Sequence, residues 1–312
     1  MSVQQRVDRE LIELGLRLQQ DGYRFTTPTP LTHERVLQRA DRCLAKDPRD
    51  VFGWSMPFDQ GLFGTERFQA LECAGILEQQ DGLWRSTVRW SSLNDLLFVH
   101  SSFPTKQNDA VFFGPDTYRF ARAINAYLQQ RAAPVKHAVD IGCGAGVGAV
   151  LIAQAYPQAQ VIAVDINPQA LRLTAVNAEL AGTDNIAIYH SDLLASVEGR
   201  FDLVVANPPY MNDQQQRAYR HGGGALGEAL SVRIVREALP RLSQGGTLLL
   251  YTGVAMVAGE DPFLAMIGSM LGSDFSWTYV ELDPDVFGEE LLKPEYEKVE
   301  RIAVTLLTVS RN

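Results

Sequence analysis

Four consecutive residues, Asn207-Pro208-Pro209-Tyr210, combine residue types and spacing that suit a chemical role. They follow an apolar run, residues 201–206, that predicts a buried strand. Two successive prolines fix two φ angles, and the residue before the first proline is kept out of helix. The strand therefore ends in a rigid corner carrying an asparagine, whose amide can hold a planar nitrogen nucleophile. Asn-Pro is also an ordinary turn signal, so the rest of the chain must decide between site and turn.

A glycine-rich segment, residues 142–148, follows the predicted strand Val135–Ile141 and opens a predicted helix. Glycines let the backbone approach a ligand closely, and a helix N-terminus favours negative or polar groups. The dinucleotide fingerprint needs its third glycine at position 147, where this chain has Val147. An acid, Asp140, precedes the glycines and suits an amine or positive charge better than a pyrophosphate. The segment therefore predicts a small cofactor other than a nicotinamide dinucleotide, which counts against an oxidoreductase.

Two further acids follow predicted strands. Asp165 ends Gln160–Asp165, where a carboxylate can accept both hydroxyls of a ribose; helix capping is the alternative. Asp192 follows Ile186–His190 and can accept from an adenine amino group while Leu193 packs on the ring; a loop acid is the alternative. Because parallel strands end at one edge of a sheet, these acids and the asparagine corner are predicted to meet there.

Strands and helices alternate from residue 135 onward, which predicts an α/β fold with a doubly wound, mostly parallel sheet. The predicted strands are Val135–Ile141, Gln160–Asp165, Ile186–His190, Phe201–Ala206 and Thr247–Tyr251, and the predicted helices are Ala149–Ala155, Gln169–Ala181 and Leu226–Leu239. The last strands, Asp274–Leu282 and Val299–Val309, are predicted to close the sheet as an antiparallel pair. We expect residues 112–312 to form this cofactor-binding domain.

Residues 1–111 are expected to form a separate N-terminal domain, helical and winged-helix-like, that covers or selects the substrate. Two helices are predicted near its start, over residues 1–22 and over Leu31–Leu44, the second capped by Thr32. A helix over Glu66–Ala74, a strand over Leu83–Trp90 and a return strand over Leu93–His100 then resemble a winged helix. Winged helices often bind DNA, but this helix is not basic, so a substrate-covering or dimerising lid is favoured.

The motifs together resemble a known family. The segments VDIGCGAGVG, VIAVDINP, HSDLL and FDLVVANPPY, in this order, are similar to the Rossmann-like S-adenosyl-L-methionine-dependent methyltransferases. The Asn-Pro-Pro-Tyr (NPPY) form resembles members that methylate planar or amide nitrogens, such as release-factor glutamine and adenine-N6 methyltransferases. The resemblance covers about residues 112–255.

The resemblance implies S-adenosyl-L-methionine as cofactor and a role for each motif residue. The residues implied in cofactor binding are Asp140, Gly142 and Gly144 at the methionine, Asp165 at the ribose, Asp192 and Leu193 at the adenine, and also Ile166 and Asn207, the last holding the nucleophile. Residues 112–117 resemble a segment that covers the methionine end, which adds Thr117; a Gly-Pro turn opening the helix Tyr118–Gln129 is the alternative. Asn207, Pro208 and Tyr210 are the expected catalytic residues.

The chemistry expected at the corner is transfer of a methyl group to nitrogen. The Asn207 oxygen and the Pro208 carbonyl would accept the two N–H groups of an amide, and Tyr210 would stack on a planar acceptor. In the following loop, Arg220 or His221 would hold a substrate carboxylate, with a solvated loop as the alternative. Two other functions stay open: cyclisation of S-adenosyl-L-methionine to azetidine-2-carboxylate, which releases methylthioadenosine, and cofactor sensing by a DNA-binding regulator.

The composition sets outer limits on function. The 312 residues carry a formal net charge of −9, and residues 1–115 hold 13 basic and 15 acidic side chains, leaving 15 and 22 for the remainder. The absence of a basic part counts against a nucleic-acid partner and favours a small-molecule or protein acceptor. Three well-separated cysteines, no signal-peptide pattern and no bilayer-length apolar run predict a cytoplasmic protein without a membrane segment. No Cys/His spacing resembles a metal site.

Overall fold

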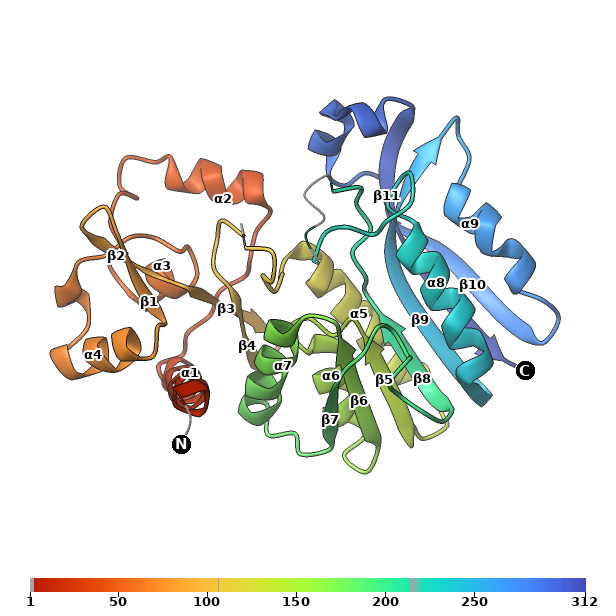
Figure 1. Cartoon of the computed structure of the whole chain (residues 1–312), viewed down its shortest axis with the longest axis horizontal. Helices are drawn as coiled ribbons and strands as arrows, with labels where there is room; N and C mark the ends of the chain where they lie inside the picture. The colour runs from red at the N-terminus through yellow and green to blue at the C-terminus, as the bar shows by residue number, and fades with distance from the viewer. Residues whose placement is uncertain (1–2, 106, 214–216, 218) are drawn as a thin grey trace.

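The computed structural model describes residues 3–105, 107–213, 217 and 219–312. Figure 1 shows a large sheet with its helices on one side of the molecule and the N-terminal helices and hairpins on the other. The first helix, α1 (Val3–Gln20), buries Leu11, Leu14 and Leu18 along one face, as its apolar spacing predicts. Met1 and Ser2, which the expected helix over residues 1–22 included, lie outside the described residues.

Seven strands form the large sheet, in the order β10-β11-β9-β8-β5-β6-β7. Their bounds are β5 (His137–Ile141), β6 (Gln160–Asp165), β7 (Ile186–His190), β8 (Phe201–Ala206), β9 (Leu242–Val257), β10 (Phe275–Asp283) and β11 (Val299–Arg311). The strands from β5 to β9 pair in parallel, and β11 runs antiparallel between β9 and β10. The predicted α/β doubly wound sheet with an antiparallel C-terminal pair is therefore confirmed.

Helices cover both faces of this sheet. They are α5 (Pro115–Gln130), α6 (Val147–Ala155), α7 (Pro168–Leu180), α8 (Ala229–Ala238) and α9 (Pro262–Ile267), with single turns η2 (Leu239–Arg241), η3 (Gly268–Met270), η4 (Gly288–Leu292) and η5 (Pro294–Tyr296). Neighbouring residues of one strand enter different cores: Ala138 packs with the α5, α6 and α7 side, and Val139 packs with the α8 and α9 side. The central strands are apolar on both faces because both faces are covered.

The N-terminal part contains short helices and two hairpins. Its elements after α1 are α2 (Pro30–Leu37), α3 (Pro48–Phe52), η1 (Gln60–Leu62), α4 (Thr65–Cys73), β1 (Leu77–Gln80), β2 (Leu83–Ser86), β3 (Val88–Leu93) and β4 (Leu96–Ser101). The strand expected over Leu83–Trp90 is wrong in extent, because it breaks at Thr87. Its first half pairs with β1 and its second half with β4, which gives two separate two-stranded sheets.

The second predicted helix is also corrected. It ends at Leu37 and not at Leu44, and its N-cap is Thr29, whose hydroxyl accepts from the amide of Thr32. The expected cap, Thr32, is thus already inside the first turn, because Pro30 fits the first helical position and Thr29 stays extended. Asp47 begins a further short helix, α3, by accepting from the amide of Asp50.

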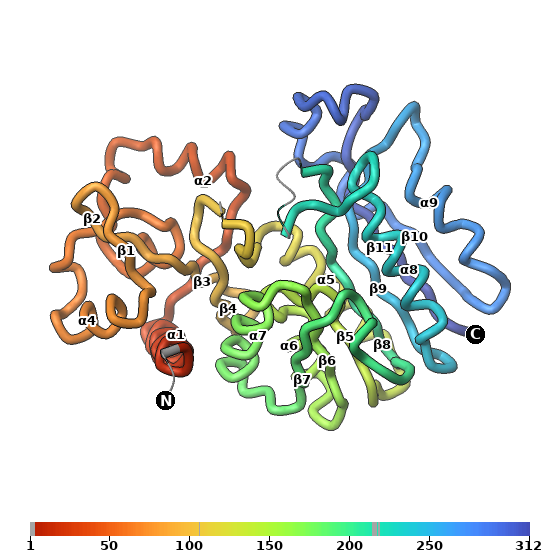
Figure 2. The backbone as a smooth tube through the Cα atoms, viewed as in Figure 1, coloured from red at the N-terminus to blue at the C-terminus, as the bar shows by residue number. Residues whose placement is uncertain are grey.

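The N-terminal part shares its apolar core with one face of the large sheet. Polar contacts cross the same boundary: Tyr118 in α5 accepts from the amide of Thr27 at 3.0 Å, and Arg172 in α7 pairs with Asp8 in α1 at 2.6 Å. Figure 2 shows the tube of α1 beside that of α7. Among the residues that the structure describes, no helix is both long and apolar enough to cross a bilayer.

Candidate active site

The predicted motif residues come from strands that end at one edge of the large sheet. In β5 and β8, Ile141 pairs with Ala206, and in β6 Val164 pairs with Ile141, so the three strands end level with one another. The glycine turn follows β5, Asp165 ends β6, and Asn207 follows β8. The structure thus brings these three motifs together, as the parallel topology requires.

The glycine turn leaves an open, backbone-lined space. Gly142 and Gly144 have φ of +68° and +55°, a region that residues with a Cβ rarely adopt. Apart from each glycine and its two chain neighbours, no atom of the described residues lies within 4 Å of the position that a Cβ would take at either residue. By contrast, a Cβ at Gly146 would press on Thr174. The turn therefore packs tightly at its rear and stays open at its front, where a ligand can approach the backbone.

Asp140 lies beneath the turn and braces the helix that follows. Its carboxylate is 1% exposed and accepts from the amide of Ala149 at 2.9 Å. Burial raises the pKa of Asp140 to about 7; the Ala149 amide opposes this rise and the nearby Asp165 adds to it. A Cβ at Gly148 would stand 2.7 Å from the Asp140 carboxylate, so only glycine leaves space for this contact. In this structure the Asp140 carboxylate supports the helix that follows the turn, and its expected place at a methionine moiety stays a prediction.

Asp165 ties the end of β6 to both flanking turns. One carboxylate oxygen accepts from the amide of Gly144 at 3.0 Å and the other from the amide of Asn167 at 2.9 Å. Burial raises the pKa of Asp165, and these backbone amides oppose that rise. The next residue, Ile166, is 53% exposed, which is unusual for a large apolar side chain at a strand end. The pair offers an acid and an apolar surface side by side.

The residues after β7 differ in exposure. The Asp192 side chain is 60% exposed and pairs with Arg233 of α8 at 3.1 Å. Leu193 has φ of +50° and is 7% exposed, because its side chain packs in the core on the α8 side of the sheet. The expected packing of Leu193 on an adenine ring is therefore limited to the little surface that it exposes.

The Asn207 amide is free at the edge of the sheet. It is partly exposed, and no hydrogen bond joins its side chain to another residue in the described part of the chain. Pro208 is buried behind it. An amide without an internal partner at the rim of an open turn can accept from and donate to a ligand.

Tyr210 lies under the corner, which corrects the expectation that it stacks on a planar acceptor. Its hydroxyl donates to Asp116 at 2.5 Å, and the residue is 7% exposed. Its ring meets Phe287 edge-on, with the ring centroids 6.1 Å apart, and fills the space that a Cβ would need at Gly253. The ring is thus a buried anchor.

The first turn of α5 supplies the hydrogen-bond partner of the Tyr210 hydroxyl. Asp116 accepts from Tyr210, from the hydroxyl of Tyr251 at 2.8 Å, and from Arg119 at 3.1 Å. Thr117, expected at the methionine end, is buried, and its hydroxyl accepts from the amide of Gly114 at 3.2 Å, which closes the first turn of α5. Sequence reasoning missed the contacts that Asp116 makes with Tyr210 and with the hydroxyl of Tyr251, although Tyr251 was expected at the end of a strand that faces the pocket.

The loop after the corner is held by internal ion pairs. Arg220 pairs with the buried Glu290 at 2.5 Å, and His221 accepts from the amide of Asp213 at 3.2 Å. Arg220 and His221 therefore already have protein partners in this arrangement, and the holding of a substrate carboxylate by either stays a prediction. Ala218, in the same loop, lies outside the described residues.

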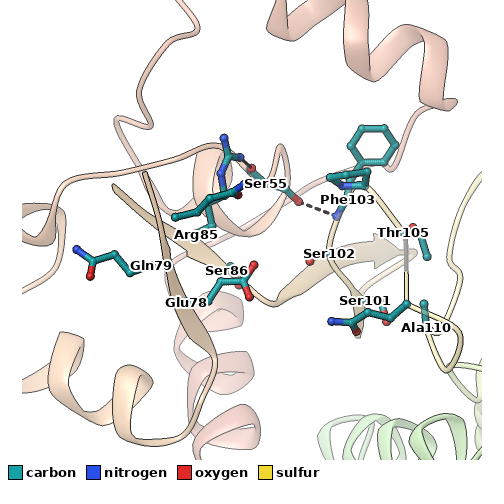
Figure 3. Close-up of a pocket in the computed structure, with 13 residues that line it drawn as sticks. Ser55, Glu78, Gln79, Arg85, Ser86, Ser101, Ser102, Phe103, Thr105 and Ala110 are labelled. Atoms are coloured by element: carbon teal, nitrogen blue, oxygen red, sulfur yellow. Dashed lines mark hydrogen bonds between the residues drawn. The ribbon is translucent and has the colours of Figure 1, made fainter. Parts of the chain in front are cut away.

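A separate cavity of about 540 Å³ lies in the N-terminal part. Figure 3 shows Glu78, Arg85 and Ser86 of the first hairpin facing Ser101 and Ser102 across it. The lining is largely polar. Residues 101–105, 107 and 110 form one wall, and nearby the carbonyl of Asp109 accepts from Asn167 at 2.8 Å. Within the described ranges, no group of His, Cys, Asp and Glu side chains has the arrangement of a metal site.

The sheet order, the open glycine turn and the acid that ends the second parallel strand define the class of Rossmann-like methyltransferase domains. Residues 120–257 match the family described as "Methyltransferase small domain", which confirms the resemblance seen in the motifs.

Sequence relatives give the same class. The chain is 35% identical over 130 residues to the ribosomal protein uL3 glutamine methyltransferase of Neisseria gonorrhoeae, which covers 38% of this chain and 44% of the relative. It is 37% identical over 122 residues to the release factor glutamine methyltransferase of Deinococcus radiodurans, covering 36% and 44%. The match thus spans less than half the length of either relative.

Solved structures of similar fold include two RNA methyltransferases. The M. jannaschii tRNA m1G37 methyltransferase has a TM-score of 0.49 at 16% identity, over 72% of this chain and 57% of that one. The T. thermophilus 16S rRNA N2 G1207 methyltransferase, in complex with AdoMet and guanosine, has a TM-score of 0.47 at 18% identity, over 82% and 64%.

Proposed function

We propose that this protein is an S-adenosyl-L-methionine-dependent methyltransferase that modifies a glutamine side-chain amide of a protein acceptor. One observation supports it above the others: the free Asn207 amide stands at the same sheet edge as the open backbone of Gly142 and Gly144. The acceptor class comes from the sequence relatives, which are glutamine methyltransferases of a ribosomal protein and of release factors.

The residues at this edge fit the proposed cofactor. The open backbone of Gly142 and Gly144 suits the methionine end, and each Asp165 oxygen keeps a lone pair for a ribose hydroxyl. Ile166 offers apolar surface to the adenine, and the exposed Asp192 carboxylate can accept from its amino group. When bound, S-adenosyl-L-methionine supplies a methyl group on a positively charged sulfur that is open to attack by nitrogen.

The Asn207–Tyr210 corner can compensate for the weak nucleophilicity of an amide nitrogen. An amide nitrogen is a poor nucleophile because its lone pair is delocalised into the carbonyl. Asn207 Oδ1 and the Pro208 carbonyl would accept its two N–H groups, which favours localisation of the lone pair and disperses the positive charge that develops during transfer. The proton leaves after transfer, so the corner needs no general base.

We assign acceptor recognition to residues 1–111 and cofactor binding to residues 112–312. A protein acceptor needs more contact area than the corner offers, and the polar cavity beside residues 101–110 adjoins the segment that reaches Asn167. The helix α4, which a winged helix would present to DNA, has Glu66 and Glu72 against one Arg67, so a polypeptide suits it better than a nucleic acid. Such acceptors place the activity in the cytoplasm.

Product analysis by mass spectrometry tests the proposal. The purified protein would be incubated with S-adenosyl-L-methionine alone, and then with ribosomal protein uL3, a release factor, or glutamine-containing peptides from them. We expect S-adenosylhomocysteine only when an acceptor is present, together with one added methyl group on a glutamine. Methylthioadenosine formed without acceptor would instead identify cyclisation of the cofactor and overturn the proposal.

A further inference from the structure

Asp116 is the meeting point of three hydrogen-bond donors beneath the NPPY corner. It is 5% exposed at the first turn of α5, and Tyr210, Tyr251 and Arg119 donate to its two oxygens at 2.5, 2.8 and 3.1 Å. Arg119 also donates to Asp283, at the end of β10, at 2.7 Å. The buried carboxylate therefore has a cationic partner and a full set of donors, which makes its position well defined.

The two prolines between Tyr210 and Asn207 couple the position of Asn207 to that of Tyr210. Pro208 and Pro209 fix two of the φ angles between Asn207 and Tyr210, so the four residues move largely as one unit. The Tyr210 hydroxyl donates to Asp116, and the Tyr210 ring packs against the backbone of Gly253 and the ring of Phe287. Fixing Tyr210 therefore limits how the Asn207 amide can turn.

We propose that Asp116 is a positioning residue: through its bond to Tyr210 it sets the direction of the Asn207 amide and the Pro208 carbonyl. This inference rests on the proposed function, which assigns those two groups to the acceptor amide. It makes Asp116 act on turnover through Tyr210, without touching either the cofactor or the acceptor.

Kinetics of two conservative variants test the link. Asp116→Asn removes the charge, and Tyr210→Phe removes only the hydroxyl while keeping the ring that fills the space at Gly253. Each is expected to lower kcat by about tenfold or more, the scale of a lost hydrogen bond to a charged group, with the cofactor Kd changed by less than about threefold. Both substitutions act on the same hydrogen bond, between the Tyr210 hydroxyl and Asp116. The double variant is therefore expected to lose no more than about twofold in kcat beyond the worse single variant.

A tyrosine elsewhere in the sheet provides the matched control. Tyr279 in β10 donates to Asp261 at 2.7 Å, well away from the corner in sequence and on the opposite core. Tyr279→Phe should leave kcat within about twofold of the unchanged enzyme. Additive losses in the double variant, or unchanged kcat in both single variants, would overturn the positioning role.

A readout without turnover separates this inference from the proposed function. With ¹⁵N-asparagine labelling, the side-chain resonances of Asn207 are assigned by their loss in Asn207→Ala. We expect Asp116→Asn and Tyr210→Phe to shift or broaden them, and Tyr279→Phe to leave them in place. Resonances that stay unmoved in both site variants would refute positioning. A wild-type protein that methylates none of the acceptors would refute the proposed function, whatever these resonances do.

Discussion

Asn177 in α7 binds both backbone groups of Val99 in β4. Its Oδ1 accepts from the Val99 amide at 2.8 Å, and its Nδ2 donates to the Val99 carbonyl at 3.0 Å and to the carbonyl of Ala145 at 2.9 Å. One fully buried side chain thus connects the second N-terminal hairpin with the glycine turn. The N-terminal part is therefore structurally continuous with the edge of the sheet that carries the candidate site.

Asn177→Ala is expected to lower the free energy of unfolding by about 2–4 kcal/mol, because it leaves three buried backbone groups without their partner. Urea denaturation followed by circular dichroism measures the change. Asn185→Ala is the control: the Asn185 side chain donates to the carbonyls of Ala159, Tyr156 and Ala153, but it is only half-buried and should cost less. If both variants lost the same free energy of unfolding, the contact of Asn177 with Val99 and Ala145 would contribute no more to stability than the contacts of the half-buried Asn185.

Asp165→Ala is expected to weaken binding of S-adenosyl-L-methionine at least about tenfold. The change removes the ribose acceptor and also frees the amides of Gly144 and Asn167, so the glycine turn loses its brace. Isothermal titration calorimetry gives the Kd directly. Asp192→Ala, which removes an exposed carboxylate, should have a smaller effect. An unchanged Kd in Asp165→Ala would rule out the ribose assignment.

Asn207→Ala is expected to lower kcat about 10²-fold while cofactor binding stays unchanged, on the scale of removing one preorganised polar group. The assay is methyl transfer to the acceptor, with the cofactor Kd measured in parallel. Asn212→Ala serves as the control, since Asn212 lies five residues further on and its amide donates to the carbonyl of Ala225. If Asn207→Ala kept full turnover, the chemistry would have to lie elsewhere.

The sequence predicted most of the sheet because its signals are local. Largely apolar runs such as Ile186–His190 and Phe201–Ala206 match their strands residue for residue. The N-terminal part was harder to predict. Whether residues 83–93 form one strand or two depends on the bend at Thr87, which is fixed by contacts with Ile76 and Gly75 far from it in sequence.

The candidate site likewise has features that the sequence predicts and features that it does not. Strand-end acids and glycines were predictable because parallel topology gathers strand ends at one edge. Side-chain direction was not: Tyr210 turns inward to Asp116, 94 residues earlier in the chain, and Arg220 is taken by Glu290, 70 residues later. Only the folded chain brings such partners together, so neither contact has a signature in the NPPY motif or the loop after it.

Asp140 is expected to make stability fall as the pH rises from about 4 to about 7. Burial raises its pKa to about 7 in the folded chain, against the usual 3.8 of an aspartate, so the native protein keeps a proton that the unfolded chain releases. The contribution is therefore fully present below pH 3.8 and lost as the pH rises through 7. Asp140→Asn keeps an acceptor for the Ala149 amide but does not titrate.

The measurement is urea denaturation of both proteins between pH 4 and pH 8. The stability of Asp140→Asn relative to wild type should rise with pH across this window, by up to about 4 kcal/mol. Asp213→Asn is the contrasting control, because the hydrogen bond from Arg217 lowers the pKa of Asp213 to about 2. Its difference from wild type should change only below about pH 4, as that carboxylate becomes protonated. A constant difference for Asp140→Asn across the window would mean that the buried Asp140 is ionised throughout and braces α6 as a charged group.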